Sequence, residues 1–135
     1  MDNVQCQGQV LIECSEKLIE RALGAALTVH RSLGPGLLES AYEQALIAEL
    51  SYLGISMRHQ VEVPVWYRGR KLGTGFRADI VVEDRLLLEL KCVDALAPIH
   101  IAQLVTYLRP LNMKRGYLLN FNTRLMRDGI KRVSI

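Results

Sequence analysis

Three charged side chains, Asp79, Glu89 and Lys91, lie at the far ends of two short apolar segments that flank a polar turn. Nine residues separate Asp79 from Glu89, and the polar turn lies at the centre of that gap. Charges are rare inside apolar strands, because burying a charge without a partner is costly. The chemistry available to these residues depends on whether their side chains meet.

A hairpin with a three-residue loop would bring the two acids together. The polar segment 83–85 suits such a loop between two apolar runs. If Val82 pairs with Leu86 across the loop, Asp79 falls directly opposite Glu89. Directly opposite Cβ atoms lie about 4.5–5.5 Å apart. The register therefore predicts a close pair of carboxylates.

Two carboxylates this close repel each other, so the fold must compensate for their charge. A hard divalent cation bound by oxygen ligands is the usual compensator. Side chains alternate faces along a strand, so Lys91 shares the face of Glu89 and Asp79, and Arg77 falls opposite Lys91. The pattern predicts a metal site with an adjacent lysine. The competing interpretation is a cross-strand salt bridge among Asp79, Glu89 and Lys91.

Hydrophobic periodicity predicts the elements that must position these residues. An order of two helices, three strands, a helix and a strand predicts an α/β fold whose mixed sheet has helices on its faces. The last strand–helix–strand unit predicts a parallel crossover. The expected helices span residues 11–33, 37–53 and 98–109, and the expected strands span 55–67, 72–83, 86–93 and 114–120, with a further short strand within 130–135 left open.

Local signals mark several boundaries of these elements. The first helix begins at Ser15, as a cap, or a turn earlier, and it stops at the Gly34–Gly36 segment. Gly54 suits the left-handed residue after the second helix, and Pro64 makes the first strand an edge or bulged strand. His30, near the end of the first helix, is expected to have a structural role.

Composition favours an ordinary globular protein, with half of its 135 residues hydrophobic and 23% charged. We expect a mobile N-terminus over residues 1–10 and one domain over 11–135. No apolar run is long enough to span a membrane, and no signal peptide is recognisable. Three cysteines without CxxC spacing argue against a disulfide framework and favour a cytoplasmic location.

The net charge of +3 is unevenly distributed along the chain. Residues 1–55 carry three Lys or Arg against seven Asp or Glu, whereas residues 109–135 carry seven against one. A basic C-terminal quarter is a plausible electrostatic footprint for a polyanion, and a solvated basic face explains it equally well.

The charged trio resembles a known nuclease motif. Asp79 followed by Glu89-Leu90-Lys91 looks like the D and (D/E)xK elements of the PD-(D/E)xK nuclease superfamily. Ala78 stands where the motif has proline, a departure that the superfamily tolerates.

Two further motifs carry the resemblance into the helices. Gln103-x-x-x-Tyr107 resembles the QxxxY motif of the exonuclease and RecB-like branch. Gly36-x-x-Glu39-x-x-Tyr42 matches the motif that names the GxxExxY family of small proteins. The likeness extends from the first helix to about residue 132. It implies a restriction-endonuclease-like αβββαβ core with an extra N-terminal helix.

The resemblance also implies a metal site containing Mg²⁺ or Mn²⁺. Asp79, Glu89 and the carbonyl of Leu90 would be direct ligands, and Glu39 would bind the metal directly or through water. Lys91 would orient or help deprotonate the attacking water and stabilise charge on the phosphate.

The remaining implied roles concern the substrate. Gln103 and Tyr107 would position the phosphate or the lysine, and Arg77 would contact the scissile phosphate or form a salt bridge with Glu89. His100, one turn before Gln103, is expected to be an ordinary surface residue.

We therefore expect a metal-dependent nuclease that hydrolyses phosphodiester bonds of DNA, with RNA as the less favoured substrate. The alternative is a nucleic-acid-binding or protein-interaction module that keeps the fold with little turnover. The small chain has few long loops for sequence recognition, so a protein partner or self-association is left open. No membrane association is expected.

Overall fold

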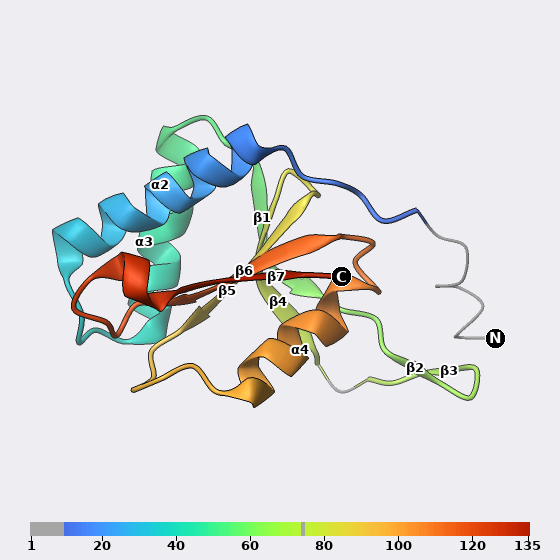
Figure 1. The fold of residues 1–135 in the computed structure, drawn as a ribbon. Coiled ribbons are helices and arrows are strands. Elements are labelled where there is room, and N and C mark those ends of the chain that lie inside the picture. The colour runs from blue at the N-terminus through green and yellow to red at the C-terminus, as the bar shows by residue number, and fades with distance from the viewer. Residues whose placement is uncertain (1–9, 74) are drawn as a thin grey trace.

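A computed structural model describes residues 10–73 and 75–135 (Figure 1). The expected mobile N-terminus falls, except for residue 10, outside the described residues. A five-stranded sheet separates two helices on one face from a third helix on the other. The elements are α2 (Glu16–Leu33), α3 (Glu39–Tyr52), β1 (Met57–Glu62), β2 (Trp66–Tyr67), β3 (Arg70–Lys71), β4 (Arg77–Val82), β5 (Leu86–Lys91), α4 (Pro98–Leu108), β6 (Arg115–Asn120), η1 (Met126–Gly129) and β7 (Ile130–Ser134).

The predicted topology is confirmed. The strand order is β1-β4-β5-β6-β7, with β1, β4 and β5 forming an antiparallel meander. β6 pairs in parallel with β5 after the crossover through α4, and β7 closes the sheet in antiparallel orientation. This mixed α/β architecture is consistent with a restriction-endonuclease-like fold. The short final strand is present as β7.

The expected strand over residues 55–67 is wrong in its second half. β1 ends at Glu62, two residues before Pro64, and the chain then forms a separate two-stranded hairpin from β2 and β3. Pro64 has no N–H to donate to a ladder, and β1 is an edge strand, as that proline indicated. The second strand is also shorter than expected, because β4 begins only at Arg77.

The helix boundaries follow the local signals closely. The Ser15 side chain accepts a hydrogen bond from the N–H of Leu18 at 3.1 Å, so α2 begins with this cap rather than a turn earlier. Gly54 lies just after α3 with a φ of 73°, the left-handed conformation that glycine adopts without a Cβ penalty.

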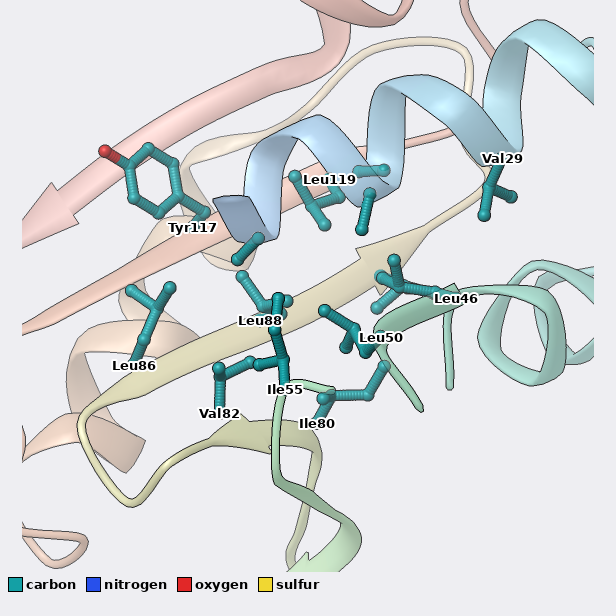
Figure 2. Packing of buried hydrophobic residues seen from close by; sticks show 14 of the residues in the cluster. Val29, Leu46, Leu50, Ile55, Ile80, Val82, Leu86, Leu88, Tyr117 and Leu119 are labelled. Carbon is teal, nitrogen blue, oxygen red and sulfur yellow. The ribbon is translucent and has the colours of Figure 1, made fainter. Parts of the chain in front are cut away.

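The sheet packs a hydrophobic core on each of its faces. On one face, α2 and α3 cover Ile80, Leu86 and Leu88 (Figure 2). On the other face, α4 contributes Leu104 and Leu108 to a second cluster that includes Leu87 of β5. β5 is therefore buried on both sides, as expected for a central strand.

A search of the described helices found none that is both long enough and apolar enough to cross a membrane.

Candidate active site

The register predicted for the β4–β5 hairpin is confirmed near its turn. Val82 pairs with Leu86, and the ladder continues to Ile80 opposite Leu88. Glu83 and Asp84 in the loop adopt left-handed φ angles of 49° and 54°, which close the turn in three residues. The backbone ladder stops after Leu88, although both strands continue.

Side-chain carboxylates replace the backbone ladder at the next position. The N–H of Asp79 donates to Oε2 of Glu89 at 2.7 Å, and the N–H of Leu90 donates to Oδ2 of Asp79 at 2.8 Å. Each acid therefore bonds to the backbone of the opposite strand. These two bonds hold the carboxylates at the open end of the hairpin.

Burial makes the charge on these acids costly. Glu89 is only 3% exposed, and burial together with the nearby charge of Asp79 raises the pKa of Glu89 from its ordinary value to about 8. Burial also raises the pKa of Asp79, against the opposing effect of its hydrogen bond from Leu90. A site that favours protonated acids in this way would gain from a bound cation.

Polar side chains of α4 extend to Lys91, close to the two acids. The ammonium of Lys91 donates to Oε1 of Gln103 at 3.1 Å, and the amide of Gln103 lies 3.4 Å from the hydroxyl of Tyr107. Gln103 and Tyr107 are four residues apart, so they lie on one face of the helix. Burial, followed by the charge of Glu89, raises the pKa of the Tyr107 hydroxyl. The expected link between the motif helix and the lysine is thus present.

Glu39 lies in the first turn of α3. Its side chain is exposed, and partial burial and the negative charge of Asp79 raise its pKa while Lys91 lowers it. The charge of Glu39 therefore interacts with the charges of Asp79 and Lys91. An acid in a first helical turn is also stabilised by the helix dipole. The position of Glu39 is therefore compatible both with helix stabilisation and with metal binding.

The other two residues of the GxxExxY pattern position Glu39. Tyr42 is fully buried, and its hydroxyl donates to the carbonyl of Gly34 and accepts from the N–H of Leu37 at 3.1 Å. Gly36 has a φ of 102°, which side-chain-bearing residues rarely adopt. The glycine and the tyrosine thus shape the loop that leads into α3.

Sequence reasoning missed Gln60 and Glu43. The amide of Gln60 donates to Glu43 at 2.8 Å and lies 3.4 Å from Oδ1 of Asp79. Gln60 adopts a left-handed φ of 50° within β1, a feature without a sequence signal because glutamine is not typical of that region. Glu43 did carry a signal, because it lies one helical turn after Glu39.

Three further residues complete the sequence predictions. Arg77 is exposed, and its guanidinium lies 3.4 Å from the carbonyl of Gln60 rather than forming a salt bridge with Glu89. His100 accepts a hydrogen bond from the N–H of Ala97 at 2.9 Å and so helps to cap α4. His30 is buried, and its Nε2 lies 2.7 Å from the carbonyl of Thr123, in accord with its expected structural role.

The donor chemistry at the hairpin suits a hard cation. Within residues 10–73 and 75–135, no group of three or more His, Cys, Asp and Glu side chains is arranged to hold a metal ion. Asp79 and Glu89 would therefore act as a pair, with the Leu90 carbonyl and water as further oxygen ligands. Mg²⁺ commonly keeps several waters and binds through one or two carboxylates, so the residues fit such an ion.

A comparison with protein families decides the assignment. A sequence model described as the PD-(D/E)XK nuclease superfamily matches residues 16–133, which is nearly the whole described chain. The chain belongs to the PD-(D/E)XK nuclease superfamily. Neither the search of curated proteins nor that of solved structures returned a match.

Membership of the PD-(D/E)XK superfamily gives the hairpin geometry a functional context. The superfamily implies a nuclease-type function, a nucleic-acid substrate and, in general, a divalent metal. Asp79, Glu89 and Lys91, which resemble the acids and lysine of this motif in type and spacing, lie together at one end of the hairpin.

Proposed function

We propose that this protein is a metal-dependent nuclease that hydrolyses phosphodiester bonds of DNA, with RNA as the less favoured substrate. One observation carries the proposal. Asp79 and Glu89 each bond to the opposite strand, and Lys91 lies two residues after Glu89 on the same strand face, in contact with Gln103. A cross-strand salt bridge alone would not require the contact from α4.

In this proposal the acids bind the metal. Asp79 and Glu89, with the Leu90 carbonyl, would hold a Mg²⁺ or Mn²⁺ ion, and Glu39 would reach it directly or through water. When bound, such an ion lowers the pKa of its water and neutralises charge on the phosphate.

Lys91 would act on the substrate beside the acids. Its ammonium would orient the attacking water and stabilise negative charge on the phosphate oxygens. Gln103 accepts from this ammonium and so restricts where it points, and Tyr107 lies against the amide of Gln103. Arg77, exposed at the start of β4, would contact the scissile phosphate.

We also assign the chain, within its superfamily, to the GxxExxY group and the RecB-like branch. The support is structural as well as sequential. Gly36 and Tyr42 shape the loop before Glu39, and Gln103 touches the motif lysine. These contacts support the assignment, because Tyr42 contacts the loop before Glu39 and Gln103 contacts the motif lysine.

A nuclease assay tests the proposal directly. The protein is incubated with single-stranded DNA, duplex DNA and RNA, each with Mg²⁺, with Mn²⁺ and with EDTA. Cleavage that needs a divalent ion and disappears in Glu89→Gln is expected, because glutamine keeps the hydrogen bond from Asp79 but supplies no carboxylate charge. Arg58→Gln, remote from the site in an exposed ion pair, is the matched control.

Two results would overturn it. Cleavage that survives Glu89→Gln unchanged would show that another site or a contaminant acts. Binding of nucleic acid without cleavage in either metal would favour the alternative function, a binding module that keeps the nuclease fold.

A further inference from the structure

A cavity of about 440 Å³ opens at the loop that follows β6. None of the acids or α4 side chains of the candidate active site lines it. The end of α2 forms one wall, and the loop after β6 with η1 forms the other, where η1 packs against α2 (Figure 1). Three of its lining residues are arginines. This arginine pocket is lined by Leu27, His30, Arg31, Gly34, Arg124, Leu125, Met126 and Arg127.

Ion pairs divide the basic residues of the C-terminal quarter into two groups. Lys114, Arg115 and Arg132 pair with Glu13, which precedes α2, or with Glu16, its first residue, and are therefore neutralised within the fold.

Arg124 and Arg127 of the pocket belong to the other group, and Arg31, from the last turn of α2, lines the same cavity. Arg31, Arg124 and Arg127 are exposed, and in the described part of the chain they form no ion pair and no side-chain hydrogen bond. Their charge is therefore concentrated around one cavity without internal compensation. Such a cavity attracts an anion, and guanidinium groups match the oxygens of a phosphate.

The pocket is physically connected to the candidate active site. Phe121, the first residue after β6, donates its N–H to the carbonyl of Lys91 at 2.9 Å. Its ring stacks on Tyr42 with centroids 4.6 Å apart and lies 6.3 Å from the His30 ring of the pocket wall. Gly34, also in the wall, accepts the hydroxyl of Tyr42. These contacts of Phe121 and Tyr42 thus link the pocket wall to the backbone of Lys91.

We propose that the arginine pocket binds backbone phosphates of the same nucleic-acid strand that is cleaved at Asp79 and Glu89. The inference rests on the proposed function and adds a second contact point for the substrate. The shared chemistry is a phosphate, which a free ion would also provide. A strand is favoured because the pocket is open and its lining loop follows β6, which pairs with the strand that carries Glu89 and Lys91. The exposed Leu125 also offers an apolar surface for sugar or base.

Binding without divalent ions tests the pocket separately from cleavage. Fluorescence anisotropy measures the affinity for a labelled single strand of about 16 nucleotides in EDTA over a range of salt concentrations. The variant is Arg31→Gln/Arg124→Gln/Arg127→Gln. The control is Arg58→Gln/Lys71→Gln/Lys114→Gln, which removes the same charge from residues held in ion pairs elsewhere.

The pocket variant should bind on the order of a hundredfold more weakly at low salt, and its log–log salt slope should fall by about two. The control should change the slope by less than about one. Equal losses in the two variants would overturn the proposal, because only overall charge would then matter. So would an unchanged affinity in the pocket variant.

A second arm separates a strand from a free phosphate. Binding of inorganic phosphate is measured by calorimetry for the wild type and for the pocket variant. If the variant loses phosphate binding and keeps strand binding, the ligand is a free ion and the proposal fails. Absence of cleavage by the wild-type protein would overturn the proposed function. It would leave this binding result intact, so the two failures are distinguishable.

Discussion

The two ends of the β4–β5 hairpin differ in the groups that hold the strands together. At the turn, backbone groups pair Ile80 with Leu88 and Val82 with Leu86. At the open end, the carboxylates of Asp79 and Glu89 bond to backbone N–H groups instead. The same register therefore packs apolar side chains at the turn and holds the acids of the candidate active site at the open end.

Stability is distributed unequally between these ends. The apolar residues at the turn are buried on both faces of the sheet and contribute favourable free energy. The acids at the open end carry raised pKa values, because burial disfavours their charged forms. The charge of Asp79 adds to this effect at Glu89, and the charge of Glu43 adds to it at Asp79. The candidate active site is thus a local source of instability that the turn end offsets.

The sharpest contrast is expected for Lys91→Met at the open end. Methionine keeps most of the aliphatic length of lysine but removes the charge that faces the phosphate. We expect kcat to fall by about 10²–10⁴, with a free energy of unfolding close to that of the wild type. Steady-state kinetics and urea denaturation measure the two effects. A variant that keeps full activity would remove Lys91 from the mechanism.

Leu88→Ala should show the opposite behaviour. Removing this fully buried side chain should lower the free energy of unfolding by about 2–5 kcal/mol, measured by urea denaturation. Activity per folded molecule should persist at low temperature. Leu72→Ala, at a side chain 37% exposed, is the control and should cost less than about 0.5 kcal/mol. Equal losses at both positions would contradict the assigned core.

The pH dependence of stability should reveal the destabilising effect of the charged form of Glu89. Its pKa of about 8 in the folded state lies above the ordinary value of 4.5, so between these values the folded protein holds a proton that the unfolded chain has released. Stability without metal should therefore fall as pH rises from about 4.5 to about 8. Denaturation midpoints in EDTA across this range measure the slope.

Glu89→Gln should flatten that slope, because glutamine does not titrate. Asp79 and Glu39, whose pKa values are also raised, contribute with the same sign and remain in the variant. An unchanged slope in Glu89→Gln would assign the pH dependence to other groups.

The smallest effect is expected at the turn surface. Arg58 and Asp84 form an ion pair whose side chains are 58% and 69% exposed. Solvent screening makes such pairs worth about 0–1 kcal/mol, so Arg58→Ala should shift the denaturation midpoint only slightly. A loss as large as that of Leu88→Ala would show that the turn depends on this pair.

The hairpin was predictable because a short loop and alternating faces determine its register. Knowing that Val82 and Leu86 flank a three-residue loop is enough to align Asp79 with Glu89. The end of the ladder was not predictable, because it depends on carboxylates competing with backbone carbonyls for the same N–H groups. That competition is decided by three-dimensional fit.

The first strand shows a different limit of sequence reasoning. Alternating valines on both sides of Pro64 suggested one long strand, but the chain breaks there and forms a small hairpin of its own. Gln60 was missed for a related reason: its amide reaches Asp79 only because the edge strand adopts a left-handed angle at this residue. The helix motifs, by contrast, follow from spacing, since three and four residues define one helical face.

The parallel pairing of β5 with β6 has a consequence for the order of folding. The β4–β5 hairpin is local in sequence and can form quickly, whereas the pairing of Lys91 with Asn120 must wait for the crossover through α4 to close. A chain with only the hairpin formed would hold both acids before Gln103 reaches the lysine. Competence for cleavage would then be acquired at a late, cooperative step, which keeps an incompletely folded chain inactive.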